Sequence, residues 1–384
     1  MSEFKIQDQV LMADPSPTPG LGFIVKSSPR PYQVIFFSGD GAGQRLSNEI
    51  LSHTAPLLLV DKNIYNLYLK GKVGIEGIPT FLVDAIEEKK GIETVLEIID
   101  FLEINKATKS SMLYVVGGGI MQDLGAFSGY IYKRGIPWVY VPTTLLGQGD
   151  SSVGGKTALN HKSTKNLLAL FSAPRKIITD TGFLKTLPQE DWFSGIGEIF
   201  RLCITGGRDF LNVFSKEINA FLKGDIEATS RLIASSLSAK KAIVEFDEFE
   251  LDLRRSMNYG HSFGHALEAL TNYQISHGIG VAIGILVENE IAFKRGLLSE
   301  ADRNELLNLG SKIIPPGAMA QFKNANLDGI IELLRRDKKA EGTILKLATL
   351  EAIGQMRFID FSLDQSGESE LRSAVKSVLG SLNQ

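Results

Sequence analysis

Several features that mark particular classes of protein are scarce in this sequence. Its 384 residues include one cysteine, Cys203, so no internal disulfide can form, which is typical of a reducing cytoplasm. No apolar run reaches the roughly 18 residues of a membrane span, and residues 1–20 lack the basic start and apolar core of a secretory signal. With 41 basic and 44 acidic residues, the chain has no overall charge suited to nucleic acid. We therefore expect a cytoplasmic protein without membrane or nucleic-acid partners.

The composition is that of a globular protein, with 43% apolar and 22% charged residues, and the length suffices for two domains. Before about residue 188, apolar runs of strand length alternate with glycine turns and helical patterns, which is typical of a parallel α/β sheet. The expected strands are 32–37, 55–60, 111–116, 136–141 and 176–180.

After residue 188 the apolar residues recur at helical spacing. The expected helices are 209–222, 225–246, 256–272, 280–295, 300–313 and 327–336. A short β-like stretch follows at 344–350, and an amphipathic helix ends the chain. The fold class is therefore an α/β, Rossmann-like N-terminal domain over 1–188 and a mainly α-helical C-terminal domain over 189–384. Residues 1–30 are expected to form an irregular arm or a short edge strand.

Three of the five histidines fall within seventeen positions. His261 and His265 are four residues apart, which places both on one face of a helix. Such a pair can hold zinc or a similar divalent ion, and His277, expected in a loop between helices, would add a third imidazole. A carboxylate would complete the site, although spacing alone does not select one of the 44 acids. Ordinary core or surface histidines are the alternative interpretation.

Two glycine-rich segments also suit ligands. Gly117–Gly119 follows an expected strand and precedes a helix, as in turns that approach a pyrophosphate, although Gln122 breaks the dinucleotide fingerprint and a plain turn remains open. Asp150 occupies the first glycine position of a P-loop, which argues against an NTPase. The cations and amides that follow, from Lys156 to Asn166, suit a small oxygenated anion or, alternatively, form a solvated loop.

Five blocks stand out when the motifs are taken in order: GGGIMQDLGAFSGYIYKRGIPWVYVPTTLLGQGDSSVGGKTALNHKSTKN, SGIGEIFR, LRRSMNYGHSFGHALEA, HG and DKK. Together they resemble the 3-dehydroquinate synthase family and, more broadly, the sugar phosphate cyclases. The resemblance extends over about residues 32–350, most of the chain. The resemblance implies a dehydroquinate synthase-like fold and a carbon–oxygen lyase that uses NAD and a divalent metal, zinc or cobalt. It further implies cyclisation of a seven-carbon sugar phosphate, above all 3-deoxy-D-arabino-heptulosonate 7-phosphate to 3-dehydroquinate, by a homodimer.

The resemblance also assigns roles to individual residues. The metal ligands would be Glu198, His261 and His277. The catalytic group would be His265, which contacts the leaving phosphate, with Asp150, Lys156 and Arg201. The substrate-binding residues would be Arg134, which reaches a neighbouring subunit's phosphate site, and Lys165, Asn166, Lys241, Arg254, Asn258 and Lys339. The cofactor-binding residues would be Asp61, Asn63, Glu87, Lys90, Gly118, Gly119, Asp123, Thr143, Thr144, Phe183 and Thr186.

The chain departs from the family pattern at a few positions. Arg201 replaces the usual Lys three residues after the metal glutamate, and it is a poorer proton carrier. Ile279 replaces the acid of the usual HGE, Gln122 replaces a glycine, and Thr164 replaces the glycine of GKN. The segment between Lys241 and Arg254 is about one residue short. These departures affect the expected substrate more than the expected chemistry.

Three alternatives follow. A paralogous cyclase would act on an amino-dehydroquinate precursor or on sedoheptulose 7-phosphate, although cyclases of the latter type tend to have Pro where this chain has His265. A metal-dependent polyol dehydrogenase would share the architecture, but its first ligand is usually Asp rather than Glu198. An inactive ligand-binding paralogue is supported by Arg201 and Ile279 alone.

Overall fold

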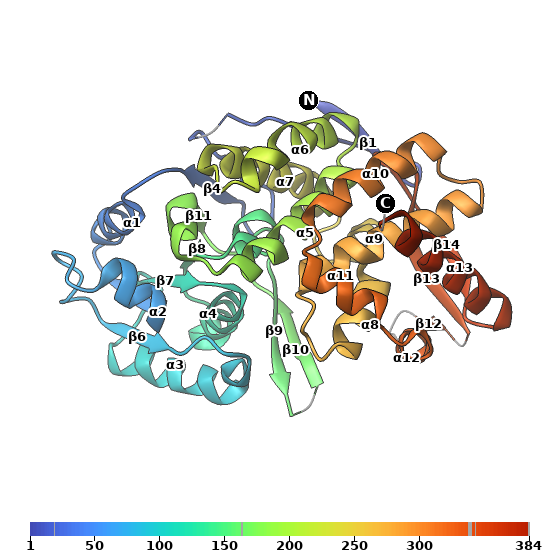
Figure 1. Cartoon of the computed structure of the whole chain (residues 1–384). Coiled ribbons are helices and arrows are strands. Elements are labelled where there is room, and N and C mark those ends of the chain that lie inside the picture. The colour runs from blue at the N-terminus through green and yellow to red at the C-terminus, as the bar shows by residue number, and fades with distance from the viewer. Residues whose placement is uncertain (19, 163, 337–339, 342, 383–384) are drawn as a thin grey trace. The chain divides into compact units, whose positions relative to one another are not determined.

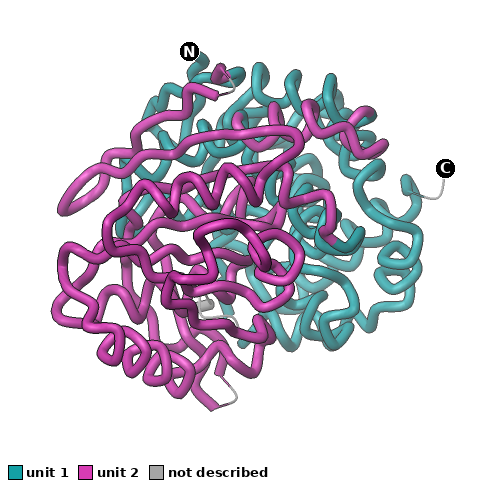
Figure 2. Tube along the Cα trace, turned by 90° about the vertical axis from the view of Figure 1, so that its left-hand side faces the viewer, with its two compact units in different colours: residues 1–16, 188–219, 235–384 teal, residues 17–187, 220–234 magenta. Residues whose placement is uncertain are grey.

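The computed structural model describes residues 1–18, 20–162, 164–336, 340–341 and 343–382, and it divides the chain into two compact units (Figure 2). Unit 1 comprises residues 1–16, 188–219 and 235–384, and unit 2 comprises 17–187 and 220–234. One boundary between the units falls between Leu187 and Pro188. The units are nevertheless discontinuous, since the N-terminal segment belongs with the C-terminal half and residues 220–234 belong with the sheet.

Unit 2 is built on a seven-stranded sheet of order β3-β4-β11-β8-β7-β5-β6. All neighbouring strands are parallel except the pair of β3 and β4. The strands are β3 (Phe23–Val25), β4 (Tyr32–Phe37), β5 (Pro56–Asp61), β6 (Thr80–Val83), β7 (Met112–Gly117), β8 (Trp138–Pro142) and β11 (Lys176–Asp180). Central strands such as β8 are buried along their whole length, which explains their continuous apolar runs. The α/β interpretation of this part is confirmed.

The helices of unit 2 pack on this sheet (Figure 1). They are α1 (Ala42–Leu51), α2 (Lys62–Ile64), α3 (Ile92–Ile104) and α4 (Gly119–Ile131). One core cluster joins Leu46 and Ile50 of α1 to Val60, Val116 and Val141 of the sheet. Helix α4 lies close against β7 because residue 125 is glycine: a Cβ there would lie 2.4 Å from a methyl of Val115.

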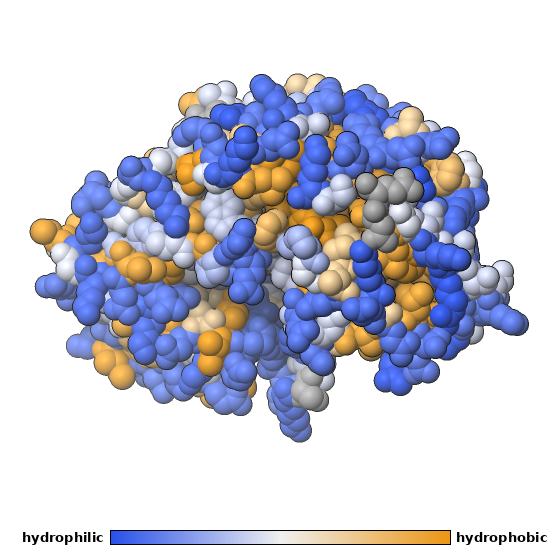
Figure 3. Space-filling view, viewed as in Figure 1, coloured by the Kyte–Doolittle hydropathy of each residue, from blue (hydrophilic) through white to orange (hydrophobic). Residues whose placement is uncertain are grey.

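The polar segment from Lys156 to Asn166, for which the sequence left an anion-binding segment or a solvated loop open, lies in a hairpin. Strands β9 (Lys156–His161) and β10 (Thr164–Phe171) pair antiparallel. The side chains of β10 are mostly exposed, and its apolar residues at 167–171 do not alternate with polar ones, so the segment lacks the pattern of a half-buried strand. The space-filling view shows a hydrophilic hairpin tip (Figure 3).

Unit 1 is mainly helical with a five-stranded sheet of order β12-β13-β14-β1-β2. Its strands are β1 (Ser2–Ile6), β2 (Gln9–Ala13), β12 (Ala340–Glu341), β13 (Ile344–Ala352) and β14 (Gln355–Ser362). Its helices, two of which the unit boundaries cut, are α5 (Gln189–Thr205), α6 (Arg208–Phe221), α7 (Ile226–Phe246), α8 (His261–Leu270), α9 (His277–Lys294), α10 (Glu300–Ile313), α11 (Pro316–Lys323), α12 (Leu327–Arg335) and α13 (Gln365–Ser381). Among the described helices, none has both the length and the apolar character needed to cross a membrane.

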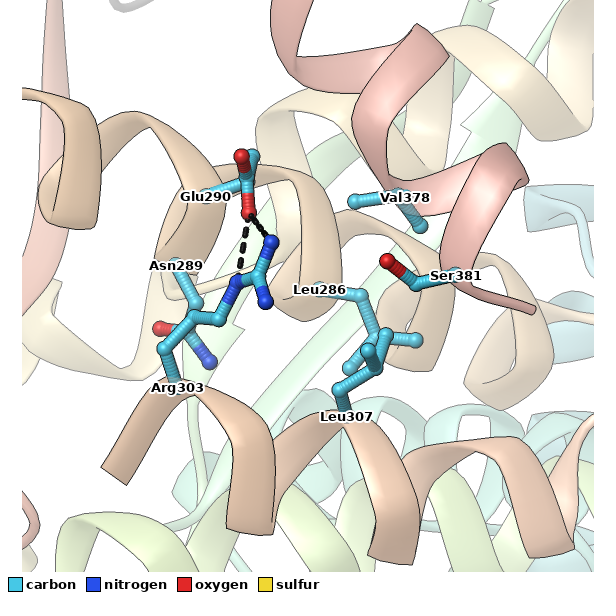
Figure 4. A pocket seen from close by; sticks show the side chains of 7 residues that line it. All are labelled: Leu286, Asn289, Glu290, Arg303, Leu307, Val378 and Ser381. Carbon is cyan, nitrogen blue, oxygen red and sulfur yellow. Dashed lines mark hydrogen bonds and ion pairs between the residues drawn. The ribbon is translucent and has the colours of Figure 1, made fainter. Parts of the chain in front are cut away.

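Helix α9 is buried on all sides from Gly278 to Ala292 and contacts α5, α8, α10 and α13. Its buried acids have partners: Glu290 pairs with Arg303 of α10 at 2.7 Å. Figure 4 shows this pair beside a small cavity of about 10 Å³, room for about one water. A helix of this kind serves as the core element around which the others pack.

The continuous helix expected over 256–272 is wrong. A short 3-10 helix, Leu253–Asn258, precedes α8, and the chain turns between them at Gly260, whose φ is 78°. A Cβ at Gly260 would lie 2.6 Å from the carbonyl oxygen of Val281 on α9, so only glycine fits this turn. His277 is also not in a loop: it is the first residue of α9.

Candidate metal and cofactor sites

Three side chains from three helices of unit 1 converge on one point. Glu198 lies in the middle of α5, His261 begins α8 and His277 begins α9. The Oε1 atom of Glu198 lies 3.2 Å from Nε2 of His261 and 3.0 Å from Nε2 of His277. The acid, which lies 63 and 79 residues before the two imidazoles in sequence, therefore shares one centre with them.

Glycines at the helix crossings make this convergence possible. A Cβ at Gly197 of α5 would lie 1.9 Å from the carbonyl oxygen of Gly278 on α9. A Cβ at Gly284 of α9 would lie 2.0 Å from the carbonyl oxygen of Gly260, just before α8. Side chains at these two positions would force the helices apart. Glycine at these crossings is therefore part of what forms the site.

Arg201 contacts the same carboxylate from its other side. Its Nε donates to Oε2 of Glu198 at 2.6 Å, and both side chains are buried. Burial alone would raise the pKa of Glu198, but Arg201 and the two histidines outweigh it and hold that pKa well below its usual range. Arg201, expected among the catalytic residues, is thus oriented toward a candidate metal ligand.

His265 lies one helical turn after His261 and is more exposed. Its ring stacks on that of His277 with 5.5 Å between centroids, and its ring meets that of His261 edge-on at 5.2 Å. The candidate nitrogen atoms of the three histidines all lie within 4.8 Å of one another. His265 therefore lies beside the acid and the two imidazoles, at the more open side of the cluster.

The donor set fits a divalent ion. Two ligand atoms at about 2.0–2.2 Å from one tetrahedral ion lie about 3.3 Å apart, close to the 3.0 and 3.2 Å between Glu198 and the two imidazoles. One buried carboxylate and imidazole nitrogens are the ligand types that zinc and cobalt accept.

The two imidazoles differ in charge state. Burial lowers the pKa of His261, and the attraction of Glu198 only partly offsets it. Burial also lowers the pKa of His277, but two carboxylates, Glu198 and Glu268, outweigh it and raise that pKa to about 10. In metal-free protein at neutral pH, His277 therefore carries a proton that an ion would have to displace.

Glu268 was not identified from the sequence. Its Oε1 lies 3.1 Å from Nδ1 of His277, and the side chain is buried. The available signal was its spacing: Glu268 lies seven residues after His261 and three after His265, on the face of α8 that carries both histidines. An acid at that spacing is common on helices, so spacing alone did not select it.

The substrate-binding candidates of unit 1 belong to α7 and to the short helix that precedes α8. Lys241 pairs with Glu245 at 3.0 Å on α7, and Asn258 ends the short helix before the turn. Because that helix is separate from α8, Arg254 and Asn258 do not lie on the helix that carries the histidines. Lys339 lies outside the described residues.

Arg254 is buried within a loop that Asp247 organises. The Asp247 carboxylate accepts the backbone N–H groups of Leu251, Asp252 and Arg254, each at 2.9 Å. Burial would raise the pKa of Asp247, but these hydrogen bonds hold it below its ordinary value. The Arg254 guanidinium donates to the carbonyl of Glu248.

Most cofactor-binding candidates of unit 2 lie at the carboxyl edge of its parallel sheet. Asp61 ends β5 and accepts the N–H of Asn63 at 2.7 Å, while Thr143 and Thr144 follow β8 directly. Phe183 and Thr186 belong to the short helix after β11. Ligands of open α/β sheets bind at this edge.

The glycine turn lies among these residues. Gly117 ends β7 and Gly118 precedes α4. A Cβ at Gly118 would lie 3.0 Å from the side chain of Thr144, whereas one at Gly119 would meet nothing within 4 Å. The turn therefore leaves open space at the first residue of α4, where helix N–H groups favour an anion.

The remaining candidates of unit 2 include a polar network that joins the hairpin to residues 87–90 and to α4. Lys90 donates to Asp123 at 2.6 Å and to Asn166 at 2.7 Å. Glu87 accepts from Asn160 of β9 at 2.8 Å. Burial raises the pKa of Asp123, and Lys90 counters this only in part.

The network brings predicted substrate residues to predicted cofactor residues. Lys165 lies 4.0 Å from Glu87, and Lys156 begins β9. Asp150 belongs to the short π-helix Gly147–Ser151 after β8. The cofactor-binding candidates and the substrate-binding candidates of the hairpin thus belong to unit 2, whereas the candidate metal ligands and His265 belong to unit 1.

Arg134 lies at the opposite edge of the same sheet. It lines a cavity of about 290 Å³ beside the amino ends of β8 and β11. Three further cations line this cavity, Arg30, Lys109 and Arg175, and none of the lining residues is acidic. Such a cavity suits an anion.

Two family models match the chain side by side. The 3-dehydroquinate synthase N-terminal model matches residues 80–194, and the C-terminal model matches 195–340. The chain belongs to the 3-dehydroquinate synthase family. Membership of this family makes it an enzyme, a carbon–oxygen lyase that eliminates phosphate as it cyclises its substrate.

Curated members of the family resemble the chain over most of their length. The 3-dehydroquinate synthase of Dictyoglomus thermophilum is 33% identical over 85% of this chain and 91% of its own. That of Campylobacter concisus is 37% identical over 70% of this chain and 76% of its own. A solved structure of 2-deoxy-scyllo-inosose synthase, complexed with carbaglucose-6-phosphate, NAD⁺ and Co²⁺, superposes with a TM-score of 0.78 at 21% identity, covering 93% of this chain and 99% of that one. This last likeness confirms the dehydroquinate synthase-like fold.

Proposed function

We propose that the protein is a cytoplasmic, NAD- and metal-dependent cyclase that converts 3-deoxy-D-arabino-heptulosonate 7-phosphate to 3-dehydroquinate with loss of phosphate. The observation that carries the proposal is the convergence of Glu198, His261 and His277 on one centre in a chain of this family. The curated relatives named 3-dehydroquinate synthase support the same substrate.

In the proposed reaction, bound NAD supplies reversible oxidation of a secondary alcohol, and a zinc or cobalt ion supplies positive charge that stabilises negative oxygen. Glu198, His261 and His277 would hold the ion, with Glu198 fixed on its far side by Arg201. His265, at the open side of the cluster, would contact the leaving phosphate and move a proton.

The residues of unit 2 would bind the cofactor and the substrate chain. Gly118 and Gly119 would approach the pyrophosphate, and Asp61, Asn63 and Glu87 would bind the nucleoside part. Further contacts would come from Lys90, Asp123, Thr143, Thr144, Phe183 and Thr186. Asp150, Lys156, Lys165 and Asn166 would bind substrate oxygens. Their support is the position of most cofactor candidates at the carboxyl edge of the sheet and the network that joins them to the hairpin.

Arg134 would act on a neighbouring subunit, which makes the protein a homodimer. Its place supports this role, because it lies at the sheet edge opposite the cofactor-binding candidates of its own unit. Arg30, Lys109 and Arg175 surround it with further positive charge suited to a phosphate.

The substrate would be bound in part by Lys241, Arg254, Asn258 and Lys339. The planar guanidinium of Arg254 matches a carboxylate, which favours the heptulosonate over sedoheptulose 7-phosphate. The burial of Arg254 and its bond to Glu248 fix its orientation before substrate enters.

Phosphate release measured across a panel of six- and seven-carbon sugar phosphates, with NAD and Co²⁺ present and products identified by mass, tests the proposal. We expect phosphate and 3-dehydroquinate from the carboxylated heptulose, no net NADH, and no turnover after chelation. Release from an amino analogue, sedoheptulose 7-phosphate or a hexose phosphate alone would identify a paralogous cyclase. Net NADH from polyols would identify a dehydrogenase, and no release from any substrate would identify an inactive paralogue.

A further inference from the structure

We infer that Glu268 is a positioning residue that fixes the ring and the tautomer of His277 for metal binding. The inference rests on the proposed metal role of His277. His277 makes two contacts, through Nε2 to Glu198 at 3.0 Å and through Nδ1 to Glu268 at 3.1 Å. A carboxylate that accepts a hydrogen bond from Nδ1–H keeps the proton on that nitrogen and leaves the Nε2 lone pair for the ion.

The surroundings of Glu268 hold its carboxylate in place. The residue is 7% exposed, and it lies on α8, which packs directly on α9. A Cβ at Gly280, three residues after His277 on α9, would lie 3.1 Å from Cγ and 3.2 Å from Oε1 of Glu268. The missing side chain at Gly280 is therefore what gives the Glu268 carboxylate its place beside His277.

Glu268 also accounts for one departure of this chain. The resemblance places an acid two residues after His277 in the family, where this chain has the buried, apolar Ile279. Apart from Glu198, Glu268 is the carboxylate that the described residues bring to the His277 ring. Its contact is with a ligand, on the side away from the ion, so its effect passes through His277.

Titration of the full-length protein with Co²⁺, alone and against a competing chelator, tests the inference through metal affinity and the visible spectrum of the bound ion. We expect Glu268→Ala to weaken Co²⁺ binding about 10–100-fold and to shift the spectrum. Glu268→Gln, which retains a hydrogen-bonding oxygen, should restore part of the loss. Gly280→Ala, which keeps Glu268 but crowds its carboxylate, should weaken binding in the same direction.

The matched control is Glu290→Gln. Like Glu268, Glu290 is a buried acid, but it lies on α9 and pairs with Arg303 rather than with a histidine (Figure 4). This substitution should lower thermal stability and leave Co²⁺ affinity unchanged. If folded Glu268→Ala and Glu268→Gln bind Co²⁺ as the unaltered protein does, with the same spectrum, the positioning role is wrong and the proposed metal site stands. If the unaltered protein binds no Co²⁺, both are wrong.

Discussion

At the scale of the residue, the candidate metal site depends on one carboxylate that has partners of two kinds. Glu198 gives one oxygen to Arg201 and the other to two imidazoles. Because Glu198 and Arg201 are both buried, each of these two charges depends on the other, and removing one leaves its partner buried without compensation. The site is therefore also a structural element of unit 1.

Glu198→Gln should abolish stoichiometric Co²⁺ binding and destabilise unit 1 by about 3–5 kcal/mol, since Arg201 would keep a buried charge without its anion. Metal analysis of the variant checks the loss of binding, and hydrogen exchange checks the destabilisation. The α5 amides should lose protection, whereas strands β7 and β8 of unit 2 should keep theirs. Stoichiometric metal in the variant would contradict the assignment of Glu198 as a ligand.

Arg201→Lys should retain metal, because an ammonium still offsets the Glu198 charge. It should keep or raise kcat/KM on the carboxylated heptulose, because lysine is the residue that the family usually has there and carries protons more readily. A large fall in kcat/KM with metal retained would mean that the arginine is adapted to another substrate.

Metal affinity should depend on pH through His277, whose pKa is raised to about 10. Its proton contributes to the stability of the metal-free protein fully below the unfolded value near 6.5, and this contribution is lost as pH rises through about 10. Co²⁺ must displace that proton, so affinity should rise about tenfold per pH unit from neutral pH upward. Calorimetry in buffers of different ionisation enthalpy should find about one proton released per ion; no release would contradict a protonated His277.

At the scale of the element, glycines let three helices cross backbone to backbone. Gly284→Ala would place a Cβ 2.0 Å from the carbonyl oxygen of Gly260, which cannot move without shifting α8. We expect a loss of about 1–3 kcal/mol or more in a denaturant titration, with weakened Co²⁺ binding. Gly317→Ala in α11, where nothing lies within 4 Å, is the control and should be neutral or slightly stabilising. Equal effects of both substitutions would contradict the crossing argument.

The elements that were predicted best from the sequence are those in which the buried residues form a simple apolar pattern. Strand β8 is buried throughout and reads as an unbroken apolar run, and α10 occupies the expected residues 300–313. The hairpin β9–β10 was missed, because the side chains of β10 are mostly exposed and its short apolar run at 167–171 follows polar residues without alternation. The break at Gly260 was missed because helical spacing continues through it, although the carbonyl of Val281 on another helix excludes any side chain there.

The site was predictable to a different degree at each position. Spacing alone placed His261 and His265 on one helix face, but it could not select Glu198 among the acids, which needed the family motif. The role of Glu268 depends on how α8 meets α9, and that meeting is set by tertiary packing that no local pattern encodes.

At the scale of the whole molecule, unit 1 is assembled from distant parts of the chain. Strand β1 pairs parallel with β14, and Phe4 and Ile6 of β1 are buried in the core of unit 1. Phe4→Ala should therefore cost unit 1 about 3–5 kcal/mol, seen as lost protection of β14 amides, with unit 2 unaffected. Val10→Ala, at a 49% exposed position of β2, should have little effect. Lost protection confined to unit 2 would contradict this division of the chain.

The parallel pairing of β1 with β14 also constrains the order in which the molecule can mature on the ribosome. The strand at residues 2–6 is translated some 350 residues before its neighbour at 355–362. At about 5–20 residues per second this strand waits for tens of seconds. Unit 2, apart from residues 220–234, is complete in the nascent chain long before then. During that interval the apolar side chains of β1 have no native partner on β14, so a chaperone that shields nascent hydrophobic segments would find its target at residues 2–6.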